Sequence, residues 1–180
     1  MKVRLVLLGE APPRLVPAVF AGLPVCFEAG DIVARDLDLD ALTDRQRAQV
    51  NAAELLELVE PPPPGWVALG LTGHDLFLPA LVYVFGLSPV GERRGLVSWA
   101  RLKPADGEPG GMDLLVRRLR IEAAHELGHA LGLIHCPVND CAMHRSLWPE
   151  AVDLKQPLYC ATCKEQLGDL CRDAEAGVSP

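Results

Sequence analysis

The sequence lacks the features that mark several large classes of protein. No apolar run in its 180 residues reaches the length of about 20 that a membrane-spanning helix requires. The formal net charge is −7, which disfavours a nucleic-acid partner. Aromatic residues make up only 5%, so no aromatic-lined substrate funnel is evident. The first apolar run, KVRLVLL, is shorter than the core of an export signal, and we therefore expect a cytoplasmic protein without a membrane partner.

What the chain does contain is the composition of an ordinary compact protein. Apolar residues make up 49% of it and charged residues 23%, and a chain of 180 residues can bury a substantial core. No internal repeat is visible, and the proline run Pro61–Pro64 is short enough to be a stiff connection inside one domain. We therefore expect one domain over residues 1–180, and a monomer.

One motif dominates the second half of the chain: HELGHALGLIH, which begins at His125. Residues four apart lie on one face of a helix, so His125 and His129 can bind the same metal ion. Gly132 can leave the right-handed helical region, end the helix and bring His135 round as a third ligand. Three protein ligands leave one of the four positions of a zinc ion open, which is typical of a catalytic site.

Glu126 follows the first of these histidines and projects beside the predicted metal. From there its carboxylate can take a proton from metal-bound water, as the general base of a hydrolytic zinc enzyme does. Histidine and glutamate at such spacings also occur on ordinary amphipathic helices, but a pattern that fixes five positions rarely arises by chance. The motif therefore predicts a zinc-dependent hydrolase.

Two close pairs of cysteines follow the motif. Cys136 and Cys141 enclose four residues, and Cys160 and Cys163 form a CxxC pair. Two such pairs separated by a loop match a closed four-thiolate zinc site. Two disulfides or buried free thiols are the alternatives, and disulfides belong to oxidising compartments, against which the lack of an export signal argues. We expect a structural zinc ion that ties the two segments together.

HELGHALGLIHC, the CAM that follows it and the final CxxC together resemble the archaemetzincins, a family of metzincin-type zinc metallopeptidases. The resemblance is sharpest over Asp113–Leu170, and VNAAELLELVE and DLFLPALVYVFGLS upstream also look like this family. It implies Glu126 as the general base and Met143 as the methionine beneath the catalytic metal. It also implies two zinc ions per chain, a catalytic ion on His125, His129 and His135 and a structural ion on Cys136, Cys141, Cys160 and Cys163.

The expected fold is α/β (α+β), with a mixed, twisted, mostly parallel sheet of the metzincin kind. Backing helices and an active-site helix at about residues 113–131 belong to an N-terminal subdomain of residues 1–134, and a small zinc-stapled C-terminal subdomain covers residues 135–180. We expect strands at Lys2–Leu8, Pro24–Glu28 and Trp66–Thr72, and helices at Leu15–Leu23 and at Asp44–Val59, the latter capped by Thr43.

One edge strand of this sheet should lie beside the metal. Val82–Phe85 and Leu96–Ala100 are apolar or alternating runs separated by turn residues, so we expect antiparallel neighbours. Either run can be the edge, and the alternative is that both are interior strands. An exposed edge pairs with an extended peptide through backbone hydrogen bonds, which holds the scissile carbonyl over the metal.

The helix that carries the motif has its own pattern. We expect Asp113 to cap its N-terminus, and Glu122 to pair with Arg118 one turn earlier. Gly128 lies inside the helix, so another backbone or the segment with Met143 should approach closely there. An apolar stripe should pack on the sheet: Leu115, Leu119, Ala123, Leu127 and Leu131. The arginines Arg117, Arg118 and Arg120 are expected on a solvated face, and Cys26 and Cys171 as buried thiols.

The residues therefore favour a zinc-dependent peptidase that acts on peptide or protein substrates. A zinc-binding interaction or regulatory protein that uses the same cleft without turnover is the alternative. A nucleic-acid-binding zinc module is suggested only by the cysteines, and the negative charge opposes it.

Overall fold

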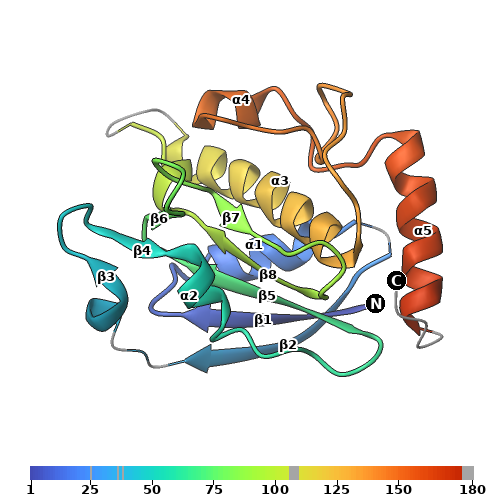
Figure 1. The fold of residues 1–180 in the computed structure, drawn as a ribbon. Helices are drawn as coiled ribbons and strands as arrows, with labels where there is room; N and C mark the ends of the chain where they lie inside the picture. The colour runs from blue at the N-terminus through green and yellow to red at the C-terminus, as the bar shows by residue number, and fades with distance from the viewer. Residues whose placement is uncertain (25, 36, 38, 106–109, 176–180) are drawn as a thin grey trace.

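The computed structural model describes residues 1–24, 26–35, 37, 39–105 and 110–175. Its main element is a five-stranded sheet in the order β2-β1-β5-β8-β7 (Figure 1). The strands of this sheet are β1 (Lys2–Leu8), β2 (Glu28–Arg35), β5 (Trp66–Thr72), β7 (Gly86–Leu87) and β8 (Arg94–Ser98). The described helices are α1 (Leu15–Ala21), α2 (Ala52–Leu56), α3 (Gly111–Leu131), α4 (Pro149–Asp153) and α5 (Ala161–Glu175), with 3-10 turns at Leu39–Leu42 and Ala100–Leu102. None of these helices is long and apolar enough to cross a membrane.

The sheet is mostly parallel, as predicted. β1 pairs in parallel with β2 and β5, and β5 pairs in parallel with β8. β7 runs antiparallel to β8, with Gly86 opposite Val97. Because β8 lies between β5 and β7, the candidate Leu96–Ala100 is largely an interior strand. The edge strand next to β8 is β7, which directly follows the other candidate, Val82–Phe85.

Helices cover both faces of this sheet (Figure 1). On one face α1 and α3 pack against side chains such as Leu5 and Leu69, which belong to the larger apolar core. On the other face α2 contributes Leu55 to a smaller core that also contains Val6 and Ala68. Neighbouring residues of a strand point to opposite faces, so β1 and β5 supply both cores. Burial of both faces is typical of a parallel sheet covered by helices.

The prediction of a helix over Asp44–Val59 is wrong for most of this segment. The chain forms instead a second, three-stranded sheet of β3 (Thr43–Asp44), β4 (Gln49–Asn51) and β6 (Leu76–Phe77). Ala48 has φ 54°, which a right-handed helix excludes. The side-chain amide of Gln49 donates to Asp75 Oδ2 at 3.0 Å, and Asn51 caps the short α2. Pairing with residues distant in the sequence therefore outweighs the helix propensity of this segment.

The strand expected at Pro24–Glu28 is also displaced, because β2 begins only at Glu28. The Phe27 amide donates to the Pro24 carbonyl at 2.9 Å, which makes the preceding segment a turn, and residue 25 lies outside the described residues. β2 is the outer strand of the sheet, and none of its residues is buried. Its sequence, EAGDIVAR, therefore lacks the apolar pattern that marks an interior strand.

α3, the helix that carries the motif, begins slightly earlier than expected. Its first residue is Gly111, and Gly110 precedes it with φ 72°, so Asp113 is not the cap. Asp113 pairs instead with Arg14 at 3.2 Å. The predicted apolar stripe is confirmed, because all of its members are buried: Leu115, Leu119, Ala123, Leu127 and Leu131. Gly132, with φ 117°, ends the helix as predicted.

The arginines that precede the motif do not form a solvated face. Arg118 is buried and donates two hydrogen bonds, of 2.8 and 2.6 Å, to the carboxylate of Asp153. Arg117 donates to the carbonyls of Asp153 and Lys155, and Arg120 donates to a carbonyl of α1. These guanidinium groups therefore hold α3 against α1, against the end of α4 and against the chain that follows α4.

Glu122 pairs with Lys155 rather than with the arginine one turn earlier. Lys155 is fully buried, and its Nζ donates to Glu122 Oε1 at 2.8 Å. The same ammonium donates to the carbonyls of Ala142 at 3.3 Å and His144 at 3.1 Å. These two residues flank Met143, so the ion pair holds the segment around the methionine against α3.

Lys155→Met is expected to lower the free energy of unfolding by about 3 kcal/mol or more, because it leaves the Glu122 carboxylate buried without its partner. The double variant Lys155→Met/Glu122→Met should recover much of this loss. Denaturant unfolding at equal zinc content measures the effect. Lys103→Met, at an exposed lysine, is the matched control and should unfold like the wild type. A loss below about 1 kcal/mol in the single variant would contradict the structural role of the pair.

Candidate active site and metal centres

Three histidines converge beside the edge of the main sheet. His125 and His129 come from successive turns of α3, and His135 follows the turn at Gly132. The Nε2 atoms of His125 and His129 are 3.1 Å apart, and the ligand nitrogens of all three residues lie within 4.8 Å of one another. Two nitrogens bound to one tetrahedral zinc ion are about 3.3 Å apart. The structure therefore brings the three residues together as the sequence predicts, at a spacing that fits one metal ion.

Backbone carbonyls fix the orientation of the two helical imidazoles. His125 Nδ1 lies 2.8 Å from the carbonyl oxygen of Ala142, and His129 Nδ1 lies 2.8 Å from that of Leu133. A carbonyl oxygen can only accept, so Nδ1 carries the proton in each ring. Each Nε2 atom keeps its lone pair and faces the other. Metal-binding histidines usually donate their second nitrogen in this way.

Burial keeps these imidazoles neutral. It lowers the pKa of His125 well below the usual range, and the charges of Lys155 and of the neighbouring histidines lower it further. Burial also lowers the pKa values of His129 and His135. Neutral imidazole is the form that binds a metal ion, so no proton has to leave these rings at neutral pH.

Glu126 lies against the edge strand, in the same cleft. A Cβ atom at Gly86 of β7 would be only 2.5 Å from Glu126 Oε1 and 2.4 Å from the Leu96 carbonyl oxygen of β8, so the glycine makes room for both groups. Burial raises the pKa of Glu126 to about 8, although the nearby Ser88 hydroxyl opposes this effect. Within the described part of the chain, Glu126 Oε2 has no hydrogen-bond partner, and neither does Ser88 Oγ. One carboxylate oxygen is therefore available to a group that enters the cleft.

Met143 packs against α3 at Gly128, the residue before His129. It is fully buried, and a Cβ atom at Gly128 would overlap its Sδ atom. This close approach is the predicted reason for a glycine in the middle of the helix. The carbonyl of Met143 accepts a hydrogen bond from the Cys136 amide at 2.9 Å, which links the methionine segment to the residue after His135.

The histidines and Glu126 open into a cleft of about 300 Å³. The chain before β7 and the chain after Met143 form its two walls. Tyr83 joins these walls, because its hydroxyl donates to the Leu147 carbonyl at 2.7 Å. Arg145 also lines the cleft. The apolar lining residues include Leu81, Val84, Phe85, Leu87 and Leu147.

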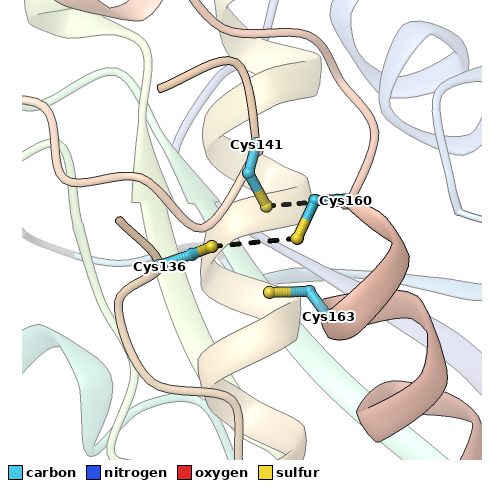
Figure 2. Close-up of side chains that lie close together, drawn as sticks. All are labelled: Cys136, Cys141, Cys160 and Cys163. Carbon is cyan, nitrogen blue, oxygen red and sulfur yellow. Dashed lines mark hydrogen bonds between the residues drawn. The ribbon is translucent and has the colours of Figure 1, made fainter. Parts of the chain in front are cut away.

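The four cysteines predicted to bind a second zinc ion lie together, with their sulfur atoms facing one another (Figure 2). Sγ of Cys136 and Sγ of Cys160 are 3.8 Å apart. Two sulfurs bound to one tetrahedral zinc ion are also about 3.8 Å apart, whereas a disulfide bond is about 2.05 Å long. Cys141 and Cys163 complete the group, and all four are free thiols. This donor set therefore fits a zinc ion rather than two disulfides.

Backbone amides support these sulfur atoms. The Cys160 amide donates to Cys141 Sγ at 3.3 Å, and the Val138 amide donates to Cys136 Sγ at 3.5 Å. A backbone hydrogen bond from Cys163 lowers the pKa of Cys160, whereas burial raises the pKa values of Cys141 and Cys163. Thiols packed this closely become thiolates together only when a cation compensates their charge.

The two remaining cysteines lie beside each other. Cys171, on α5, is buried, and Cys26, which precedes β2, is half-buried. The hydrogen bond between their side chains and the burial of Cys26 both raise the pKa of the Cys26 thiol. Both residues border the larger apolar core, where a protonated thiol packs as a small apolar group.

The sequence and the fold are similar to those of one family. Residues 47–169 match the profile of peptidase family M54. An archaemetzincin of Halobacterium salinarum is 34% identical over 169 residues, which cover 91% of this chain and 98% of that one. A crystal structure of an archaemetzincin from Methanopyrus kandleri has a TM-score of 0.80 at 31% identity and covers 96% of each chain. That of the Archaeoglobus fulgidus archaemetzincin, complexed with malonate, has a TM-score of 0.79 at 32% identity and covers 92% of this chain and 99% of that one.

The chain belongs to peptidase family M54, the archaemetzincins. The resemblance read from HELGHALGLIHC and the following cysteines is thereby confirmed, and so is the mixed α/β fold. As a member of this family the chain is a zinc metallopeptidase, and its substrates are peptides.

Several residues that shape the site were not found from the sequence. Gly86 and Ser88 reach Glu126 from the sheet edge, Lys155 reaches α3 from the turn after α4, and Arg145 lines the cleft. Their positions depend on how distant segments fold together, so no local spacing marks them. The one available signal was Gly86 at the end of an apolar run, since a glycine in a strand often marks a close approach.

Gly86→Ala is expected to lower peptidase activity by about a hundredfold, because the added methyl group overlaps both the Glu126 carboxylate and the Leu96 carbonyl of β8, and so displaces the carboxylate from the sheet edge. The zinc content should stay that of the wild type. Gly168→Ala on α5 is the matched control, since its Cβ atom meets only Arg172 Nη1 at 3.6 Å, and it should keep full activity. Measurement of kcat/KM and of metal per chain in both variants tests this; wild-type activity in Gly86→Ala would show that the glycine does not position the carboxylate.

Proposed function

We propose that the enzyme hydrolyses peptide bonds at a zinc ion held by His125, His129 and His135, with Glu126 as the general base. Bound zinc supplies a Lewis acid that polarises the scissile carbonyl and lowers the pKa of a water molecule to about 7. The observation that carries this proposal is the convergence of three neutral imidazoles beside a buried carboxylate. The site therefore combines metal ligands with a proton acceptor, which a silent zinc-binding protein would not need.

Glu126 moves the proton in this scheme. Its carboxylate accepts a proton from the attacking water and then donates it to the nitrogen of the departing amine. The environment of Glu126 suits both steps. Burial raises its pKa, whereas a divalent cation nearby would lower it, so the two effects oppose each other near neutral pH.

The substrate peptide would bind in an extended conformation along β7. This strand pairs with β8 on one side and is the edge of the sheet on the other. Gly86 of β7 contacts the Glu126 carboxylate, so a peptide paired with this edge would pass directly over the catalytic groups. Backbone hydrogen bonds would then place the scissile carbonyl before the side chains of the substrate contribute.

A second, structural zinc ion would be held by the four-cysteine site, Cys136, Cys141, Cys160 and Cys163. The 3.8 Å separation of two of its sulfurs and the amides directed at them support this role. Such an ion would tie the chain after α3 to α5, and so hold together the C-terminal subdomain of residues 135–180. Thiolate ligands persist in a reducing compartment, which is consistent with a cytoplasmic enzyme.

Glu126→Gln should abolish hydrolysis while zinc remains bound, because the amide keeps the shape of the carboxylate but accepts no proton. A fall in kcat of at least about a thousandfold is expected, with little change in KM. Peptide cleavage and metal content are measured on the same preparations. Equal activity in variant and wild type would exclude Glu126 as the general base and leave the metal site as it stands.

Elemental analysis of protein purified without added metal should find two zinc ions per chain. A chelator should remove one ion readily, from the half-exposed histidine site, and the other slowly, from the four thiolates. His129→Ala and Cys163→Ala should each lose one ion, but the first should stay folded and the second should be less stable. A single ion in the wild type, or loss of both in His129→Ala, would contradict two independent sites.

A further inference from the structure

Arg145 occupies a position in the cleft that the peptidase reaction does not explain. It lies two residues after Met143, it is exposed, and it lines the cleft together with the three histidines. A substrate bound over the metal therefore lies within the field of this guanidinium.

Arg145 has no described hydrogen bond or ion pair, unlike most other arginines of the described chain. Arg4, Arg94 and Arg118, for example, each donate to a carboxylate. Only Arg45, in the turn between β3 and β4, shares the lack of a partner among the described residues. The two carboxylates that line the cleft have other roles, because Glu122 pairs with buried Lys155 and Glu126 lies against β7. The Arg145 guanidinium is thus free to bind an anion that enters with the substrate.

The surroundings of Arg145 make the binding of an anion selective. The wall of the cleft is largely apolar, and a single charged group in an apolar cleft determines which polar group can enter. A second hollow of about 370 Å³ shares Arg145 and Leu147 with the cleft and is lined by Trp148 and Leu154. These three apolar side chains are more than half exposed, at 54%, 53% and 73%. A peptide that extends from the metal past Arg145 therefore reaches an apolar surface next.

We propose that Arg145 binds a carboxylate of the substrate, so that the enzyme selects peptides with an acidic group close to the cleaved bond. Guanidinium binds carboxylate through two parallel hydrogen bonds, which favours it over a neutral amide of the same shape. The carboxylate comes from an Asp or Glu side chain or from the C-terminus of a short peptide. The net charge of −7 repels acidic peptides from the rest of the surface, so this preference has to arise locally. The proposal rests on hydrolysis at the histidine site.

The test compares cleavage of matched peptides by the zinc-loaded enzyme. A mixture of peptides first locates a cleaved bond; the flanking residues are then varied among Glu, Gln and Lys, each with a free or an amidated C-terminus. We expect kcat/KM to be at least about tenfold higher for the preferred acid than for its amide, mainly through KM. Arg145→Gln should remove this preference and Arg145→Glu should reverse it towards Lys. Arg45→Gln, at the other exposed arginine without a described partner, should leave it unchanged.

Titration of the same peptides into zinc-loaded Glu126→Gln protein by calorimetry measures the preference without turnover. Tighter binding of the acid that disappears in the additional Arg145→Gln variant supports the proposal, even if no peptide is hydrolysed. Hydrolysis of acid and amide at equal rates would overturn it and leave the proposed function intact. An acid preference that survives Arg145→Gln would also overturn it, because the metal rather than the guanidinium would then bind the carboxylate. The free and amidated C-termini show which source of carboxylate is used.

Discussion

The hydrogen bond between His125 Nδ1 and the Ala142 carbonyl is the contact on which the rest of the site depends. It sets the tautomer of the first imidazole and directs its Nε2 atom towards that of His129. The same carbonyl accepts a hydrogen bond from the ammonium of Lys155, which pairs with Glu122 one helical turn before the motif. A buried ion pair therefore determines where the acceptor lies, and the acceptor determines where the ring points. The corresponding carbonyl for the second histidine is supplied by the glycine turn that ends α3.

The two groups of predicted metal ligands are neighbours in the chain, and this connects stability with catalysis. His135, the exposed member of the triad, directly precedes Cys136, whose sulfur faces those of the other three cysteines (Figure 2). The histidine would be free to move if only the turn at Gly132 held it. A zinc ion in the four-thiolate site would fix Cys136, and so limit the positions open to the imidazole of His135, the residue before it. On the opposite side, the contact between Gly86 and Glu126 fixes the general base relative to the sheet edge.

Features defined by short spacings could be read from the sequence, and features defined by distant contacts could not. The ligands of α3 follow from the four-residue repeat of a helix, and the turn that delivers His135 follows from Gly132. The segment 44–59 consists of good helix formers, yet β4 pairs with β6, and Gln49 reaches Asp75. The arginines before the motif look solvated in sequence, but Arg118 meets a carboxylate 35 residues away. In each case the deciding partner lies on another element, where no local pattern reports it.

A crystal structure of the zinc-loaded enzyme, with anomalous scattering measured at the zinc edge, would locate both metal ions. One peak is expected within about 2.1 Å of the Nε2 atoms of His125 and His129, with His135 as the third ligand and no side chain in the fourth position. A second peak is expected among the four cysteine sulfurs. A peak away from the imidazoles, or a fourth side chain that fills the open position, would contradict the assignment of this cleft to peptide hydrolysis.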